Sequence, residues 1–323
     1  MASRYGVHRS VLREPACAAL LSAAAGVDGV YLDATFGRGG HAAAVLAQLS
    51  THGRLIALDR DPQAIAAGRE LFADETRLTL VHASFSRMTE VSREYGHPHV
   101  DGVLMDLGVS SPQLDQAARG FSFMHDGPLD MRMDTSRGLT AAQWLAGTSE
   151  GELARVLRDY GEEPQARRLA RTLMAAQRTT PIETTSQLAA LVSAAVGRRD
   201  ANKRHPATRT FQALRIEVNG ELNELKSALD QLDGLLADGG TLSAISFHSL
   251  EDRLVKQFIR DASRVDPRLA RLPIVPEHAQ PTFEPVGRAV RADEGEVEAN
   301  PRARSATLRA ARRRPRRSGE DGA

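Results

Sequence analysis

An apolar segment that ends in Asp33 is followed by the glycine-rich run Gly37–Gly40 and then by an alanine- and leucine-rich segment over residues 42–49. A second apolar segment, residues 54–59, also ends in an acid, Asp59. Glycine permits the tight turn between a strand and a helix, and it lets backbone N–H groups approach a ligand. An acid after the second strand can accept hydrogen bonds from ribose hydroxyls. This order predicts a βαβ unit that binds an adenosine-type cofactor.

The glycine spacing alone leaves the identity of the cofactor open. Residues 37–42 fit the loose G-x-G-x-x-G/A pattern of dinucleotide sites, so NAD is one alternative and a purely structural turn is another. Asp33 favours S-adenosylmethionine instead. A carboxylate beside the turn repels a pyrophosphate, whereas it attracts the ammonium and sulfonium charges of S-adenosylmethionine.

Two more strands are predicted along the chain, over residues 78–81 and 100–106. Strands that alternate with helices indicate a mostly parallel sheet, with ligands bound at the carboxyl ends of the strands. Asp33, Asp59 and Asp106 all stand at such ends, so we expect them on one rim of the sheet. Phe85 follows the third strand, where it could contact an adenine ring or belong to the core.

The α/β alternation stops between residues 113 and 213, where only helical patterns occur. It resumes with a leucine-rich helix over 222–236 and a strand over 241–247. We therefore expect a Rossmann-like α/β core, formed by residues 1–112 and 214–323, with an inserted all-helical domain at 113–213.

Two helix starts are predicted from capping patterns. Ser149 and Glu152 have the spacing of a capping box, and Ser249 with Asp252 has the spacing of an N-cap. His248 precedes Ser249, and a role for it at a substrate is a weaker alternative.

The net charge of +1 conceals two basic segments. One lies within the helical insertion, and the other is the arginine-rich segment 301–323. We expect the insertion to contact nucleic acid, whereas the C-terminal segment is either a second contact or a solvated, disordered tail. The central basic cluster consists of Arg198, Arg199, Lys203, Arg204, His205 and Arg209.

The single cysteine, Cys17, excludes a disulfide framework and a cysteine-based zinc site. It also excludes methylation at C5 of a pyrimidine, because that reaction needs a thiolate nucleophile and Cys17 lies in an alanine-rich helical stretch. No group of His, Asp and Glu residues has metal-ligand spacing, so no metal is expected. The chain has no apolar run of membrane-spanning length and no signal-peptide layout, so we expect a cytoplasmic protein without membrane contact.

Five separated motifs, from His8 to about Arg313, closely resemble the MraW/RsmH family of bacterial 16S ribosomal RNA methyltransferases. The motifs are Asp33–His41, Met105–Ser111, Phe121–Phe123 with Leu129–Asp134, Phe211–Asn219 and Ile245–Arg253. The resemblance implies N4-methylation of a cytosine in the decoding centre, with the small ribosomal subunit as partner. The chain departs from the family pattern at Ser10, where proline is usual, and at Arg13, where an apolar residue is common.

The resemblance also implies a set of cofactor-binding residues. Gly39, Gly40 and His41 would contact S-adenosylmethionine, Asp59 would bind its ribose, and Phe85 would lie at its adenine. Asp106 and Gln113 would complete the pocket.

Asp106 is the candidate catalytic residue. The lone pair of cytosine N4 is delocalised into the ring, and hydrogen bonds from its NH2 to a carboxylate and a carbonyl favour a pyramidal, nucleophilic nitrogen. Asp106 with the carbonyl of Leu107 or Gly108 could supply both acceptors. The loop after Asp106 has no aromatic residue, so the base must stack elsewhere, and Phe121, Phe123 and Phe247 are the candidates.

Two other classes of function share these features. One is a ribosome assembly factor that binds S-adenosylmethionine without transferring its methyl group. The other is an amino-methyltransferase that acts on DNA or protein. The sequence is compatible with a monomer or a homodimer.

Overall fold

The computed structural model describes residues 10–197, 205–265, 268, 269, 271, 273, 276 and 279–315. The chain folds into two compact units, one formed by Met1–Gly108 with Asn223–Ala323 and the other by Val109–Leu222. The helical unit is thus somewhat longer than the 113–213 expected from the sequence.

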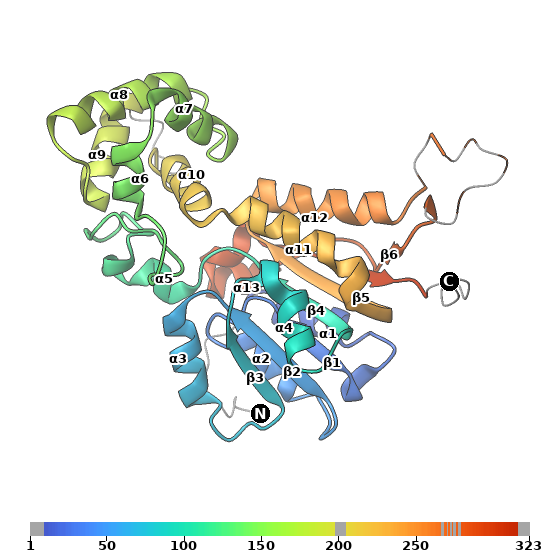
Figure 1. The fold of residues 1–323 in the computed structure, drawn as a ribbon. Coiled ribbons are helices and arrows are strands. Elements are labelled where there is room, and N and C mark those ends of the chain that lie inside the picture. The colour runs from blue at the N-terminus through green and yellow to red at the C-terminus, as the bar shows by residue number, and fades with distance from the viewer. Residues whose placement is uncertain are drawn as a thin grey trace. The chain divides into compact units, whose positions relative to one another are not determined.

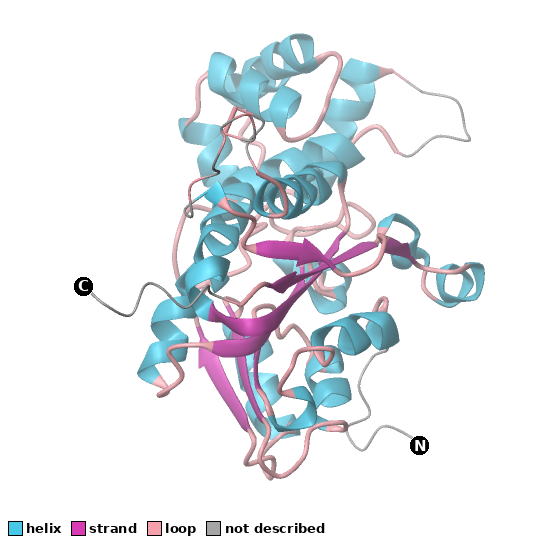
Figure 2. Cartoon of the chain, turned by 90° about the vertical axis from the view of Figure 1, so that its right-hand side faces the viewer, coloured by secondary structure: helices cyan, strands magenta, loops and turns pink. Residues whose placement is uncertain are grey.

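The first unit contains a sheet of order β3-β2-β1-β4-β5-β8-β6, with β7 paired to β8. Figure 2 shows its strands in magenta. Strands β1 to β5 are parallel, and the order reverses between β1 and β4, which is where ligands bind in open α/β sheets. The Rossmann-like fold predicted from the sequence is confirmed. The parallel strands are β1 (Val30–Asp33), β2 (Arg54–Asp59), β3 (Leu78–His82), β4 (Val100–Asp106) and β5 (Leu236–Ser246).

Helices cover both faces of the sheet (Figure 1). One face packs against α1 and α2, and the other packs against α4, α11 and α12. The strand residues alternate between the two layers: Leu55 and Ala57 face α1 and α2, whereas Ile56 and Leu58 face the opposite layer. The helices outside the second unit are α1 (Arg13–Leu20), α2 (Gly40–Leu46), α3 (Pro62–Leu71), α4 (Met88–Glu94), α12 (Ser249–Ala262) and α13 (Glu294–Ala299), and α11 (Glu221–Leu235) begins at the boundary of the units.

The second unit is helical, as predicted. In the part of it that the structure describes, β pairing is confined to a bridge between Pro128 and Thr184. Ser149 caps α7 by accepting a hydrogen bond from the Glu152 N–H, as its spacing indicated. The helices of this unit are α5 (Ser111–Asp115), α6 (Ala141–Gly147), α7 (Glu150–Asp159), α8 (Ala166–Thr179), α9 (Thr185–Val196) and α10 (Thr208–Asn219).

The C-terminal basic segment departs from the expected tail. Residues Thr307–Arg313 form β8, which pairs antiparallel with β5 and with the short strands β6 (Phe283–Pro285) and β7 (Val290–Arg291). Of the two alternatives for the segment, a solvated tail does not describe this stretch, because Leu308 and Ala311 are buried in the two apolar layers. Residues 316–323 lie outside the described residues.

Arginines of β8 form internal ion pairs. Arg309 binds Asp252 of α12 through two hydrogen bonds, of 2.7 and 3.0 Å. The Arg313 guanidinium is buried and donates to the Asp233 carbonyl and the Asp238 carboxylate. These two arginines of the basic segment therefore stabilise the fold.

No helix among the described residues is both long enough and apolar enough to cross a membrane.

Candidate active site at the carboxyl ends of the strands

Three acids end three neighbouring parallel strands: Asp59 ends β2, Asp33 ends β1 and Asp106 ends β4. Asp33 pairs in register with Ala57 of β2 and with Leu104 of β4, so the strands finish at nearly the same level. The prediction that the three acids share one rim of the sheet is confirmed.

The glycine turn after β1 closes over this rim. Gly37 and Gly39 have φ angles of +57° and +74°, the left-handed region that favours glycine. A Cβ on Gly39 would come within 2.6 Å of the Phe72 ring, so this position also excludes a side chain by packing. The turn leads into α2, which begins at Gly40.

Asp59 is tied to the turn by backbone hydrogen bonds. Its Oδ2 accepts from the Gly37 N–H at 2.6 Å, and its Oδ1 accepts from the Asp61 N–H at 2.8 Å. Burial raises the pKa of the Asp59 carboxyl to about 6, although these two N–H groups oppose the rise. The carboxylate is therefore held in one orientation, and each of its oxygens keeps a lone pair for a further donor.

Asp33 is almost completely buried, with only 1% of its surface exposed. Its Oδ1 accepts a hydrogen bond from the Thr35 N–H at 3.0 Å, but Oδ2 has no partner among the residues that the structure describes. Burial raises the pKa of the Asp33 carboxyl to about 7, against the lowering effects of His41 and of the Thr35 N–H. A buried carboxylate oxygen without a donor is costly, and a bound cation would relieve that cost.

His41 faces Asp106 across the rim. Its Nε2 lies 3.4 Å from Asp106 Oδ2, but neither ring nitrogen makes a well-aligned hydrogen bond within the described part of the chain. Burial by itself lowers the pKa of His41; the interactions with Asp106 and Cys17 and the charge of Asp33 outweigh this effect and raise the pKa to about 10. The imidazole is thus a buried cation beside two acids.

The backbone of Asp106 is fixed by Thr35, which stands two residues after the acid that ends β1. The Asp106 N–H donates to Thr35 Oγ1 at 2.6 Å, and the side-chain oxygen Oδ1 is buried without a partner in the described structure. Within the described residues, Asp33 and Asp106 thus each carry a buried oxygen that lacks a donor. Such a pair fits a ligand that carries positive charge and N–H groups, as the amino acid portion of S-adenosylmethionine does.

Comparison of the sequence with known proteins assigns the chain to a family. The sequence profile of the MraW methylase family matches residues 6–314. The chain belongs to the MraW methylase family. It is 52% identical over 313 residues to the ribosomal RNA small subunit methyltransferase H of Nitrosospira multiformis, a match that covers 95% of this chain and 98% of the relative. It is 54% identical over 307 residues to the protein of the same name from Thiobacillus denitrificans, with coverage of 95% and 97%.

Two further residues that the resemblance to this family assigned to the cofactor belong to other elements than the glycine turn. Phe85 begins a 3₁₀ turn after β3 and is partly buried against the apolar layer of α4, α11 and α12. Gln113 belongs to the helical unit, where its Oε1 accepts from the Ser110 N–H at 2.9 Å in a capping box that begins α5. A cofactor role for these two residues stays a prediction.

The three aromatic candidates for base stacking have different surroundings. Phe121 is buried in the core of the helical unit, and Phe123 stacks on His205 with ring centroids 4.5 Å apart. Phe247 follows β5, is partly buried, and has a ring atom 3.7 Å from the position that a Cβ on Gly108 would occupy. The Leu107 N–H donates to the Ile245 carbonyl, which fixes the loop after Asp106 beside this segment.

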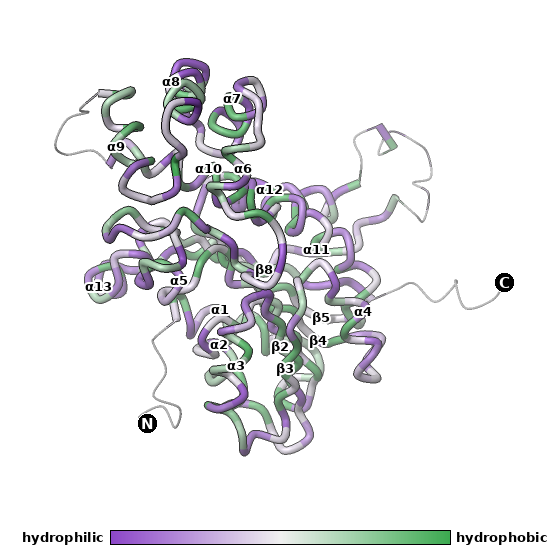
Figure 3. Tube along the Cα trace, turned by 60° about the vertical axis from the view of Figure 1, so that its left-hand side comes forward, coloured by the Kyte–Doolittle hydropathy of each residue, from purple (hydrophilic) through white to green (hydrophobic). Residues whose placement is uncertain are grey.

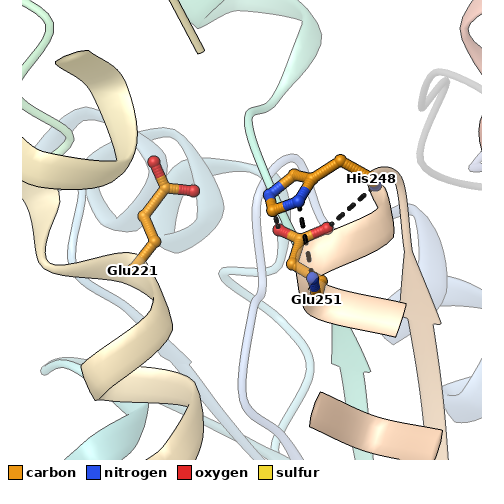
Figure 4. A group of neighbouring side chains, drawn as sticks. All are labelled: Glu221, His248 and Glu251. Carbon is orange, nitrogen blue, oxygen red and sulfur yellow. Dashed lines mark hydrogen bonds and ion pairs between the residues drawn. The ribbon is translucent and has the colours of Figure 1, made fainter. Parts of the chain in front are cut away.

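The start of α12 differs from the prediction, because the cap is His248 and not Ser249. His248 Nδ1 accepts from the Glu251 N–H at 3.4 Å, and Nε2 lies 3.1 Å from Glu251 Oε1 (Figure 4). The buried Glu251 carboxylate accepts in turn from the N–H groups of Phe247 and His248. The spacing of His248 and Glu251 is that of a capping box, but histidine is an unusual first member, so the pattern was missed.

Proposed function

We propose that this chain transfers a methyl group from S-adenosylmethionine to N4 of a cytosine in the decoding centre of 16S ribosomal RNA, within the small ribosomal subunit. The observation that supports the proposal is the rim beside the glycine turn, where Asp33 and Asp106 each have a buried oxygen without a donor among the described residues. Membership of the MraW methylase family and the names of the relatives supply the class of acceptor.

The rim suits a cationic nucleoside better than a dinucleotide. Asp33 and Asp106 attract the ammonium and sulfonium groups of S-adenosylmethionine and would repel a pyrophosphate. Asp59 would accept hydrogen bonds from the ribose hydroxyls, and Gly39, Gly40 and His41 would contact the amino acid portion. Phe85 would hold the adenine, and Gln113 of the helical unit would be a further cofactor-binding residue. When bound, S-adenosylmethionine supplies an electrophilic methyl group on its sulfonium.

Asp106 orients the nucleophile. Its carboxylate accepts one N–H of the cytosine amino group, and the carbonyl of Leu107 or Gly108 accepts the other, so that the N4 lone pair points out of the ring plane. The Thr35 hydroxyl and the Ile245 carbonyl hold the backbone of this loop, so the acceptors are in place before the base arrives. Positioning and fixed charge of this kind account for most of the rate in transfers without a covalent enzyme intermediate.

Phe247 is the aromatic residue that we assign to the face of the cytosine. It lies beside the Gly108 position, whereas Phe121 and Phe123 belong to the core of the helical unit. A target base must leave its stack to reach a rim of this kind, which favours an unpaired or splayed nucleotide.

The helical unit is the part that we assign to RNA recognition. Of the central basic cluster, residues 198–204 lie outside the described residues, and His205 is engaged in stacking on Phe123.

The proposal is tested by incubating the protein with labelled S-adenosylmethionine and small ribosomal subunits that lack the modification. Label in the RNA that is sensitive to RNase supports the proposal. Measured binding of S-adenosylmethionine without transfer to a competent subunit contradicts it and favours an assembly factor. Label in ribosomal protein instead favours an amino-methyltransferase of another class, and a parallel incubation with DNA tests the DNA alternative.

A further inference from the structure

Helix α8 of the second unit carries a concentrated positive charge. Its fourteen residues include four arginines and no acid. All four arginines are exposed, whereas Leu169 and Leu173 are buried in the core of the unit. The helix is therefore apolar on one side and basic on the other, and Figure 3 shows hydrophobic and hydrophilic segments alternating along this part of the chain. The exposed arginines are Arg167, Arg168, Arg171 and Arg178.

Three of these arginines form a stripe. With 3.6 residues per turn, Arg167, Arg171 and Arg178 point within about 40° of one another, and the first and last are separated by about 16 Å along the helix axis. Arg167 and Arg171 stand four residues apart, a spacing at which like charges destabilise a helix. An exposed helix face usually mixes acidic and basic residues, which avoids this repulsion. The unmixed stripe therefore indicates that its positive charge has a function.

Acidic neighbours neutralise little of the stripe. Arg171 Nε lies 3.6 Å from Glu150 of α7, and the Arg171 side chain is 77% exposed, so water screens this pair strongly. The exposed guanidiniums therefore remain available to an external anion.

A cleft adjoins the first turn of α8. Its volume is about 410 Å³, and its lining includes the guanidinium-bearing residues Arg158, Arg167 and Arg168. One acid, Glu163, also lines it, but Glu163 is buried and its Oε1 already accepts from the Gln165 N–H. Arg158 is paired with Asp159 through two hydrogen bonds, of 2.7 and 3.1 Å, whereas Arg167 and Arg168 are exposed in the first turn of the helix, a position that favours an oxyanion such as a phosphate.

We infer that the exposed face of α8 and this cleft form a surface that binds the phosphate backbone of the ribosomal RNA substrate. This inference rests on the proposed function for the identity of the polyanion. The surface would contact phosphates without reading bases, and so would contribute affinity and orientation while the rim of the sheet acts on the target cytosine.

The test compares two charge-matched triple variants of the full chain. One removes the stripe (Arg167→Gln, Arg171→Gln and Arg178→Gln). The control removes three exposed arginines of the other unit (Arg69→Gln, Arg93→Gln and Arg260→Gln). The affinities for deproteinised 16S RNA and for S-adenosylmethionine, and the methyl-transfer kinetics on unmethylated small subunits, are measured between 50 and 300 mM salt.

We expect the stripe variant to show a KM for subunits raised on the order of tenfold, with kcat unchanged within about twofold. Its affinity for deproteinised 16S RNA should fall, and the slope of log affinity against log salt should be shallower by about 2 to 3. Both variants should bind S-adenosylmethionine as the parent does. Replacement of the same three arginines by lysine should restore most of the RNA affinity, because the positive charge is retained.

An unchanged KM and salt slope in the stripe variant would overturn the inference. A raised KM for subunits with undiminished binding of deproteinised RNA would also overturn it, because the partner of α8 would then be a protein. Loss of S-adenosylmethionine binding in the stripe variant alone would mean that the stripe supports the fold. Failure of the parent to methylate subunits would refute the proposed function, and the RNA-binding measurement would still decide the inference.

Discussion

The Nε2 atom of His41 lies 3.4 Å from Oδ2 of Asp106, so the start of α2 places a buried imidazole against the acid that ends β4. Asp33 adds a second negative charge to the surroundings of the same ring. The rim thus contains one internal cation among its acids, and several measurable consequences follow from this arrangement.

His41→Gln should remove a pH-dependent stabilisation. The pKa of His41 in the folded protein is about 10, above the ordinary 6.5, so its contribution is fully present below about pH 6.5 and is lost as the pH rises to about 10. The free energy of unfolding of the variant should therefore fall below that of the parent by on the order of 2 to 4 kcal/mol at pH 6, with a much smaller deficit at pH 10. Urea unfolding at both pH values measures this, with exposed His52→Gln as the control.

A deficit in His41→Gln that is equal at pH 6 and pH 10 would contradict a charged imidazole in the folded protein. It would indicate that His41 acts by packing alone.

Asp33→Asn should stabilise the protein without cofactor. The pKa of Asp33 is raised from its usual 3.8 to about 7, so the folded state holds a proton more tightly, and stability falls as the pH rises from about 4 to 7. At pH 8 the variant, which cannot ionise, should exceed the parent in free energy of unfolding by about 2 to 4 kcal/mol. Urea unfolding at pH 4 and pH 8 measures the difference, and a parent at least as stable as Asp33→Asn at pH 8 would contradict the assignment.

The same Asp33→Asn change should weaken the binding of S-adenosylmethionine. In the parent, the Kd should decrease by up to about tenfold between pH 6 and pH 8, because the ionised carboxylate attracts the cationic ligand. In the variant, the Asp33 part of this pH dependence should vanish. Calorimetric titration of the parent and the variant with S-adenosylmethionine at three pH values measures both dependences of Kd on pH. Equal dependences in the two proteins would exclude Asp33 from the binding site.

Gly39→Ala should destabilise the fold more than a glycine substitution in an open turn. Both Gly39 and Gly96 have positive φ angles, but a Cβ on Gly39 would come within 2.6 Å of Phe72, whereas no described residue beyond its chain neighbours has an atom within 4 Å of a Cβ on Gly96. We expect Gly96→Ala to cost about 1 kcal/mol and Gly39→Ala about 2 to 4 kcal/mol. Denaturant unfolding of the two variants measures the difference, and equal losses would mean that packing against Phe72 is unimportant.

Much of the sheet unit could be predicted from local patterns. Strands that end in Asp33, Asp59 and Asp106 are apolar runs bounded by turn residues, and parallel neighbours must present their ends at one rim. The C-terminal strand β8 was missed because its buried residues Leu308 and Ala311 stand among the arginines Arg309, Arg312 and Arg313, whose charge suggested solvent. Their burial depends on pairing with β5, a contact distant in sequence that no local pattern encodes.

The roles of individual side chains were harder to predict from the sequence than the positions of helices and strands. His248 caps α12, although Ser249 is the better cap by intrinsic preference, because His248 also pairs with the buried Glu251. Phe123 was a candidate for base stacking, but it packs on His205 and Phe211 in the helical unit. Tertiary partners decide which aromatic residue remains at the rim, and the sequence does not reveal those partners.

Arg313→Gln should destabilise the protein, because the C-terminal basic segment is structural up to this residue. The buried Arg313 guanidinium donates to Asp233 and Asp238, whereas the Arg314 guanidinium is about half exposed and lies 3.9 Å from Glu284. We expect a loss of about 2 kcal/mol for Arg313→Gln and less than about 0.5 kcal/mol for Arg314→Gln. Thermal unfolding of the two variants compares them directly, and equal losses would contradict a structural role specific to Arg313.

The most direct test of the proposed reaction is nucleoside analysis of small-subunit RNA after incubation with labelled S-adenosylmethionine, with the parent and with Asp106→Ala. We predict label in N4-methylcytidine for the parent and a rate lowered by about 100-fold or more in the variant, because the amino group loses its carboxylate acceptor. Label in another nucleoside, or an Asp106→Ala variant that methylates N4 at the parental rate, would contradict the account.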